Sequence, residues 1–182
     1  MSILEIKNTA ILIIDIQEKL LNAVFNKNIL EKNSEIIAKA ANILEIPVFI
    51  TEQYPQGLGN TVNIIKENLG DCCNYYEKIE FNALNNENLS NDLKKSNIKN
   101  IVIAGIETHI CVHQTVDALI EEGFNVTVLK DCCGSRKESE YFAALDVMLN
   151  NGAKIKTTEM VLFELLKTAK HPNFKAIQAL IK

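Results

Sequence analysis

The chain has 182 residues, of which 47% are hydrophobic and 23% are charged, and its formal net charge at pH 7 is -4. This length and hydrophobic content are typical of one domain with its own core, so residues 1–182 are predicted to form a single domain. Acidic and basic residues are interspersed, and no apolar run approaches the ~20 residues of a bilayer-spanning helix. We therefore expect neither nucleic acid nor a membrane as a partner.

Short apolar runs alternate with segments of helical periodicity along the chain. The runs at 9–15 (TAILIID) and 100–106 (NIVIAGI) are typical of strands buried on both faces of a parallel sheet. The Pro- and Gly-rich segment 53–60 (QYPQGLGN) is predicted to be a loop. Strands are predicted at residues 9–15, 46–51, 75–79, 100–106, 125–130 and 155–157. Helices are predicted at residues 28–44, 62–69, 88–95, 109–122, 139–150, 160–168 and 173–181.

This alternation predicts an α/β fold in which helices cover both faces of a parallel sheet. Ligands of such folds bind beyond the carboxyl ends of the strands. Three polar residues stand at these ends: Asp15 after the first strand, Lys78 within or after the third, and Cys111 just beyond the fourth. An acid and a lysine can activate a thiol as a nucleophile. Taken singly, the acid is also compatible with a turn cap, the lysine with a surface group and the cysteine with core packing.

The segment GIETHICV places Cys111 at the start of a predicted helix directly after a strand. The partial positive charge and unpaired N–H groups of a helix start would lower the pKa of the thiol and could hold a carbonyl oxyanion. The alternative is that Cys111 packs against the sheet from the helix face.

The N-terminal sequence predicts the compartment, and the compartment together with the cysteine count predicts the state of the thiols. The sequence begins with no basic segment leading into an apolar one, so no secretory leader is expected. Five cysteines are an odd count, which argues against a disulfide framework. We therefore expect free thiols and a cytoplasmic location. The adjacent pairs Cys72-Cys73 and Cys132-Cys133 lack the spacing of zinc or redox motifs and are expected to be structural.

Several motifs, taken in order, resemble a known family. AILIIDIQEKL, TEQYPQGLG, EKIEF and GIETHICVHQT together are similar to the isochorismatase-like cysteine hydrolases. KDCCGSRKE, the TTE at 157–159 and the ending AKHPNFKAIQALIK resemble in particular the isochorismatase domain-containing group. The resemblance implies a Rossmann-like, three-layer α/β/α fold with a six-stranded, mostly parallel sheet, and a homo-oligomer. It also implies a catalytic triad of Asp15, Lys78 and Cys111.

By the same resemblance, the Ile106-Glu107 peptide bond would be cis, and the backbone N–H groups of Glu107 and Cys111 would form an oxyanion hole. The implied enzyme is a hydrolase of C–N bonds other than peptide bonds, acting on a small amide or ureide through a thioester. Residues near the motifs could contribute to substrate binding; they are Gln17, Phe25, Tyr54, Phe81 and Gln114.

This chain differs from the metal-binding members of the superfamily, so we expect it to act without a metal. Nicotinamidases carry an Asp-x-His pair and a further His after the second strand, whereas this chain has Thr51-Glu52-Gln53-Tyr54 there. His109 and His113 are four residues apart, but no HExxH motif accompanies them. We expect no metal and no cofactor. Nicotinamidase activity, vinyl ether hydrolysis as in isochorismatases proper, and a catalytically silent oligomeric scaffold stay open as alternatives.

Overall fold

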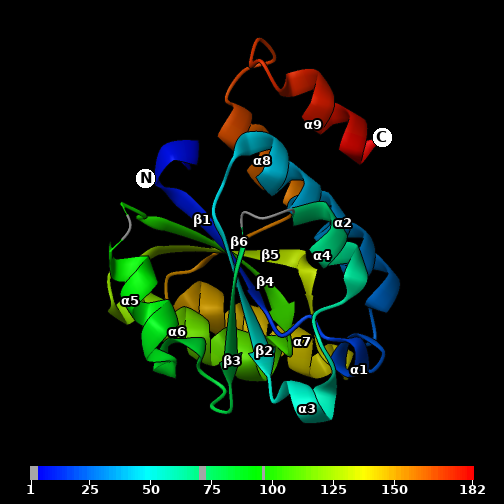
Figure 1. The fold of residues 1–182 in the computed structure, drawn as a ribbon, viewed down its shortest axis with the longest axis vertical. Coiled ribbons are helices and arrows are strands. Elements are labelled where there is room, and N and C mark those ends of the chain that lie inside the picture. The colour runs from blue at the N-terminus through cyan, green and yellow to red at the C-terminus, as the bar shows by residue number, and fades with distance from the viewer. Residues whose placement is uncertain (1–3, 70–72, 96) are drawn as a thin grey trace.

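The fold is a six-stranded sheet covered by helices on both faces, as a computed structural model shows for residues 4–69, 73–95 and 97–182 (Figure 1). The strands are β1 (Thr9–Ile14), β2 (Val48–Gln53), β3 (Cys73–Lys78), β4 (Asn100–Ile106), β5 (Asn125–Gly134) and β6 (Lys154–Lys156). Their order is β3-β2-β1-β4-β5-β6, and each neighbouring pair is parallel. The predicted α/β/α fold with a mostly parallel sheet is confirmed.

The two central strands explain the apolar runs. All residues of β1 and β4 are buried, because each strand is paired on both edges and covered on both faces. By contrast, β3 lies at an edge and exposes part of its length. The register aligns Ile14 with Thr51 and Gly105, so the carboxyl ends of the central strands meet at one edge of the sheet.

Amphipathic helices form the two outer layers. One layer has α2 (Lys27–Leu44), α4 (Asn63–Leu69), α8 (Thr158–Leu166) and α9 (Phe174–Ile181); the other has α5 (Glu87–Lys95), α6 (His113–Glu121) and α7 (Glu138–Asn150). Short turns of helix join them: η1 (Ile6–Asn8), α1 (Glu18–Leu21), α3 (Pro55–Leu58), η2 (Ala83–Asn85) and η3 (Thr108–Val112). In Figure 1, α1 and α3 mark the end of the molecule at which β1 and β2 finish. No helix among the described residues is long and apolar enough to cross a membrane.

Three local predictions from the sequence were wrong. The predicted loop at 53–60 contains a helical turn, α3, which Pro55 begins with its preset φ. The fifth strand continues past residue 130 to Gly134, because Gly105 and Ile106 of β4 pair with Cys133 and Gly134 after a register shift. The helix predicted at 109–122 is divided into the π-helical turn η3 and α6.

The structure describes both members of only one of the two adjacent cysteine pairs. Cys132 and Cys133 are fully buried within β5, and both carry free thiols. Cys72 lies outside the residues that the structure describes, so the expectation for its pair with Cys73 stays a prediction.

Candidate active site

Three strands of the sheet, β1, β3 and β4, carry the predicted triad residues to the end of the sheet where the parallel strands finish. Asp15 directly follows β1, Lys78 is the last residue of β3, and Cys111 lies in η3 just beyond β4. Asp15 has a φ of 52°, a left-handed conformation that costs free energy for a residue with a side chain. The chain therefore turns sharply at the point where the carboxylate is presented.

Asp15 and Lys78 form an ion pair with both side chains fully buried. The distance from Lys78 Nζ to Asp15 Oδ2 is 2.6 Å. Thr51 Oγ1 donates to the other carboxylate oxygen, Asp15 Oδ1, at 2.7 Å. A buried ion pair needs such additional hydrogen bonds to offset the loss of hydration. Both oxygens of the carboxylate thus have a partner.

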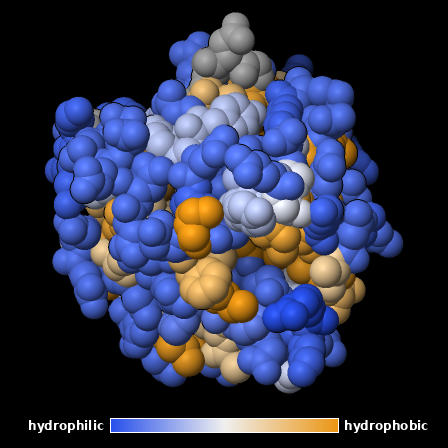
Figure 2. Space-filling view, turned by 60° about the horizontal axis from the view of Figure 1, so that its bottom comes forward, coloured by the Kyte–Doolittle hydropathy of each residue, from blue (hydrophilic) through white to orange (hydrophobic). Residues whose placement is uncertain are grey.

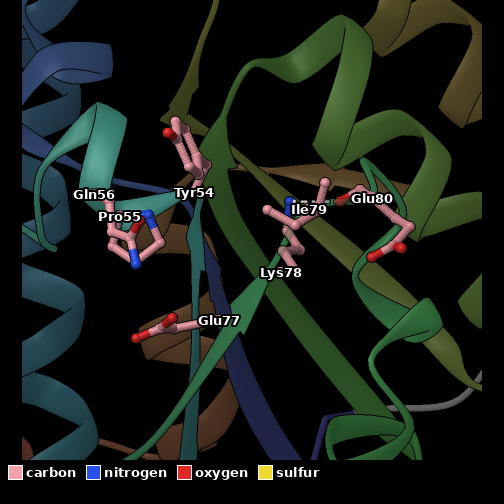
Figure 3. Close-up of a pocket in the computed structure, with 7 residues that line it drawn as sticks. All are labelled: Tyr54, Pro55, Gln56, Glu77, Lys78, Ile79 and Glu80. Atoms are coloured by element: carbon pink, nitrogen blue, oxygen red, sulfur yellow. Dashed lines mark hydrogen bonds between the residues drawn. The ribbon is translucent and has the colours of Figure 1, made fainter.

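Lys78 is held by three acceptors. Besides Asp15, its Nζ donates to Gln53 Oε1 at 2.6 Å and to the backbone oxygen of Glu80 at 3.2 Å, the second of which is drawn in Figure 3. An ammonium group has three N–H donors, so these acceptors use its full capacity. The charge of Lys78 is therefore fixed in position rather than free to move toward solvent.

Cys111 lies within reach of both members of this pair. Burial and, to a smaller extent, the carboxylate of Asp15 raise the pKa of the Cys111 thiol to about 12, although Lys78 acts in the opposite direction. The pKa of this thiol is raised, because desolvation and the nearby carboxylate outweigh the cation; the separate contribution of the helix start stays a prediction. The resting state has a neutral thiol beside an acceptor for its proton.

The turn that carries Cys111 is organised by Glu107. The Ile106-Glu107 peptide bond is cis. The backbone oxygen of Glu107 accepts hydrogen bonds from Ile110 N at 3.1 Å and from Val112 N at 3.2 Å. Its side-chain Oε1 accepts from both N and Nε of Arg136, each at 3.0 Å. One residue thus connects η3 with the segment that follows β5.

A second contact supports the same connection. His109 Nδ1 lies 3.0 Å from Ser135 Oγ, so two side chains link η3 to the end of β5. His113, which sequence spacing grouped with His109, pairs instead with Asp117 of α6 at 3.1 Å. Among residues 4–69, 73–95 and 97–182, no three His, Cys, Asp or Glu side chains are grouped to bind a metal.

Tyr54, one of the predicted substrate-binding residues, lines a cavity together with Lys78 of the predicted triad. The cavity has a volume of about 340 Å³ and is lined by Tyr54, Pro55, Gln56, Glu77, Lys78, Ile79 and Glu80 (Figure 3). Tyr54 also has a left-handed backbone, with a φ of 36°, and its N–H donates to the oxygen of Lys78 at 2.9 Å. The loop after β2 is thereby tied to the end of β3.

Gln17 is fully buried and holds this loop through hydrogen bonds. Its Nε2 donates to the backbone oxygens of Gln53 and Gly59, and its Oε1 accepts from Gln53 N at 2.7 Å. These contacts occupy the amide group, so its observed role is to hold the segment around Gln53.

The other predicted pocket residues are exposed. Phe25 packs edge-to-face on Tyr141, with ring centroids 5.5 Å apart, and its N–H donates to the oxygen of Ser135. Phe81 follows β3, and Gln114 lies in α6. Figure 2 turns the end with α1 and α3 toward the viewer and shows hydrophobic side chains gathered near the middle of that face.

Four residues of the site received no role from the sequence. Thr51 and Gln53 are two positions apart on β2, and their side chains hold Asp15 and Lys78. This spacing puts them on one face of a strand, a signal that could have identified them. Ser135 and Arg136 belong to a family motif, but their partners lie in η3, which only the folded chain reveals.

Comparisons with a family model and with known proteins point to the same family. The family model described as "Isochorismatase domain" matches residues 9–160. The chain is 41% identical to isochorismatase family protein 1A of Dictyostelium discoideum over 93% of this chain and 84% of that protein. It is 37% identical to isochorismatase domain-containing protein 2 of Xenopus laevis, over 96% and 84% of the two chains.

Solved structures share the fold over nearly the whole chain. The MAR1 ribonuclease of Caenorhabditis elegans superposes with a TM-score of 0.94 at 35% identity, covering 99% of this chain and 92% of that one. The YcaC gene product of Escherichia coli, described as an octameric hydrolase of unknown specificity, superposes with a TM-score of 0.90 at 29% identity, covering 97% and 87%.

Proposed function

Because the chain belongs to the isochorismatase domain family, we propose that it is a cysteine amidohydrolase that cleaves a C–N bond of a small amide or ureide. The observation that carries the proposal is the buried contact between Asp15 and Lys78, with the neutral thiol of Cys111 within reach of both. A carboxylate beside a protonated thiol has the arrangement that a general base needs.

In the proposed reaction, Asp15 takes the proton of Cys111 as the sulfur attacks the carbonyl carbon. The C–N bond then breaks, and the leaving nitrogen receives the proton from Asp15, which leaves a thioester on Cys111. Water attacks the thioester with Asp15 again as base, so that the acid departs and the thiol regains its proton. Lys78 stabilises the negative charge on Asp15 and on the attacking sulfur.

The developing charge on the substrate oxygen also needs donors. We assign this role to the backbone N–H groups of Glu107 and Cys111, as the family resemblance implies. The contacts of Glu107 with Ile110, Val112 and Arg136 support the assignment, because an oxyanion hole is effective only when its donors are held in place. Tyr54 at the cavity beside Lys78 and the exposed Phe25, Phe81 and Gln114 are proposed as substrate contacts, and Gln17 as support for Gln53.

The deciding experiment measures ammonia release from a panel of small amides and ureides. Wild-type protein should turn over at least one member, and Cys111→Ala should lose that turnover while keeping its circular dichroism spectrum. Cys133→Ala, which removes a buried thiol outside the site, is the matched control and should stay active per folded molecule. Hydroxylamine should intercept the thioester as a hydroxamate. Undiminished turnover by Cys111→Ala would exclude the covalent mechanism.

A second candidate activity comes from the C. elegans neighbour, which is described as a ribonuclease. We favour the amide reaction, because the formal net charge of -4 offers little attraction for a phosphate backbone. Incubation with labelled RNA separates the two. Cleavage that disappears in Cys111→Ala but persists in Cys133→Ala would favour nuclease activity. Nicotinamide and isochorismate belong in the same panel, and inactivity toward all substrates would favour the scaffold.

The proposal also covers metal dependence, oligomeric state and cellular location. We propose a metal-independent reaction, because Thr51-Glu52-Gln53-Tyr54 stands where nicotinamidases carry metal ligands; the expectation of no cofactor stays a prediction. We also propose a homo-oligomer, in line with the octameric YcaC neighbour. The cytoplasmic location expected from the N-terminal sequence stays a prediction.

A further inference from the structure

Thr115 is a buried polar residue of α6 that has no role in the reaction proposed above. It lies four residues after Cys111 and is fully buried. Its Oγ1 donates to the backbone oxygen of Cys111 at 2.7 Å. A threonine inside a helix often makes such a bond to the oxygen four residues earlier. This part of the contact is therefore local to one helical turn.

The same hydroxyl also reaches a segment that is distant in the sequence. Thr115 Oγ1 accepts a hydrogen bond from the backbone N–H of Ala83 at 2.9 Å, and Ala83 is fully buried as well. A backbone N–H can only donate, so the single hydroxyl proton of Thr115 stays available for the oxygen of Cys111. The hydroxyl thus completes a directed chain of two hydrogen bonds, in which each bond polarises the next.

Ala83 begins η2, which follows β3 and its last residue, Lys78. The segment between these two residues folds back on β3. Lys78 Nζ donates to the oxygen of Glu80 at 3.2 Å. Just after η2, Asn86 Nδ2 donates to the oxygen of Glu77 at 2.9 Å. The segment is therefore fastened to the proposed cation and to β3, and its bond to α6 carries that position over to the nucleophile turn.

Each residue of the predicted triad has a side-chain partner outside the triad. The pairs are Asp15 with Thr51, Lys78 with Gln53, and Cys111 with Thr115. Thr115 differs from the other two partners because it binds the backbone of its residue and not the side chain. A shift of the main chain at Cys111 moves the sulfur with it. A displacement of about 1 Å at a reacting atom can slow a reaction about 100-fold.

We propose that Thr115 is a positioning residue, whose hydroxyl fixes the main chain of Cys111 relative to the segment that carries Lys78. The inference rests on the proposed amidohydrolase function and adds a residue that acts through its nucleophile. Thr115 keeps the thiol at the distance at which Lys78 favours the thiolate and Asp15 accepts the proton.

Three variants of Thr115 separate its hydroxyl from its volume. Thr115→Val keeps the branched shape, but the oxygen of Cys111 and the N–H of Ala83 lose this partner. Thr115→Ser restores the hydroxyl, and Thr115→Ala replaces the valine variant if that one misfolds. The matched control is Thr9→Val at the start of β1, the end of the sheet opposite the site. Thr9 is also buried, and its Oγ1 donates to the oxygen of Glu5, four residues earlier, at 2.8 Å.

The rate at which iodoacetamide alkylates Cys111 between pH 7 and 9 tests the inference without any turnover. Thr115→Val should react about threefold more slowly than wild type, because Lys78 loses its fixed distance from the sulfur and favours the thiolate less. Thr115→Ser and Thr9→Val should react at the wild-type rate. Looser packing alone would expose the thiol and accelerate alkylation, so an equal or faster rate in Thr115→Val would overturn the proposal.

Steady-state kinetics with the best substrate of the amide panel provide a second test. We expect the kcat of Thr115→Val to fall about tenfold and its KM to stay within about twofold of wild type, because the variant disturbs the attack and not the binding. Thr115→Ser should recover most of the lost kcat, and Thr9→Val should keep the wild-type value. A normal kcat in Thr115→Val, or a loss confined to KM, would refute the positioning role.

The inference and the proposed function can fail separately. If the wild-type protein hydrolyses no amide, the amidohydrolase proposal falls, whereas the alkylation rates still decide whether Thr115 positions Cys111. If Cys111 hydrolyses an amide but Thr115→Val keeps the wild-type rates of alkylation and turnover, the proposed function stands and the role of Thr115 is excluded.

Discussion

At the scale of single residues, burial and two opposing neighbours determine the pKa of the Cys111 thiol. Burial raises this pKa most, Asp15 also raises it, and Lys78 lowers it. With a pKa of about 12, almost no thiolate exists at neutral pH before a substrate arrives. A neutral thiol should resist oxidation and alkylation, and in the proposed mechanism its proton must pass to Asp15 as the sulfur attacks.

The rate of alkylation by iodoacetamide tests this balance. Wild-type Cys111 should react slowly at pH 7 to 9 and faster as the pH rises toward the thiol pKa. Asp15→Asn removes an influence that raises the pKa, so its Cys111 should be alkylated faster than wild type even though turnover is lost. Lys78→Met should react more slowly. Labelling is followed by peptide mass spectrometry, and equal rates in the two variants would contradict the electrostatic explanation.

The same two residues determine part of the stability. Replacing either Asp15 or Lys78 with a neutral residue leaves its partner charged and buried, which we expect to cost about 3–5 kcal/mol of unfolding free energy. The double variant Asp15→Asn/Lys78→Met leaves no unpaired charge and should be more stable than either single variant. Urea unfolding of all four proteins measures this coupling. If the losses of unfolding free energy in the two single variants add up to the loss in the double variant, Asp15 and Lys78 are not energetically coupled.

At the scale of elements, the nucleophile turn depends on the close approach of β4 to β1. A Cβ atom at Gly105 would lie 2.7 Å from both Cβ and O of Ile14 and 3.0 Å from Cγ2 of Val112. Ile14 immediately precedes Asp15, and Val112 immediately follows Cys111. The absence of a side chain at Gly105 therefore sets the spacing between the proposed base and the proposed nucleophile.

Gly105→Ala should lower both kcat and stability, because the displaced backbone belongs to the site itself. Gly123→Ala is a suitable comparison: Gly123 has a φ of 88°, and a Cβ there meets nothing within 4 Å. It should cost about 1 kcal/mol through conformational strain alone and leave kcat intact. Thermal unfolding and steady-state kinetics separate the two effects. A normal kcat in Gly105→Ala would argue against this role.

The sequence predicted the regular elements well and the irregular ones poorly. Apolar runs located β1 and β4, since burial on both faces requires continuous hydrophobicity. The π-helical turn could not be anticipated, because it depends on contacts of Glu107 with residues that are distant in the sequence. The triad positions were predicted from strand ends and motifs and stay a prediction, whereas Thr51, Gln53 and Arg136 required the register and the loop contacts.

At the scale of the whole molecule, several large hydrophobic side chains lie exposed on the helical layers. Phe142 and Leu149 are seven residues apart on α7 and are 54% and 55% exposed. This spacing places them on one face of the helix. Such a face in an isolated chain is a candidate contact between copies, which agrees with the proposed homo-oligomer.

Sedimentation velocity should therefore give a mass that is a multiple of the 20.4 kDa chain. Phe142→Glu should shift the distribution toward smaller species if α7 contributes to the contact, whereas Lys175→Glu on α9 serves as the control for an added acidic residue. A wild-type mass of 20.4 kDa at micromolar concentration would contradict the homo-oligomer. The prediction of a single domain is a separate matter and stays untested.

β3 is an edge strand of the sheet, and its position affects how the site responds to local unfolding. β3 pairs with β2 on one side, yet its last residue supplies the cation of the proposed site, while the base and the nucleophile follow interior strands. Border strands open locally at a smaller free-energy cost than central ones. The proposed reaction thus depends on the strand of the three that opens most easily, and mild denaturation should abolish it while most of the fold persists.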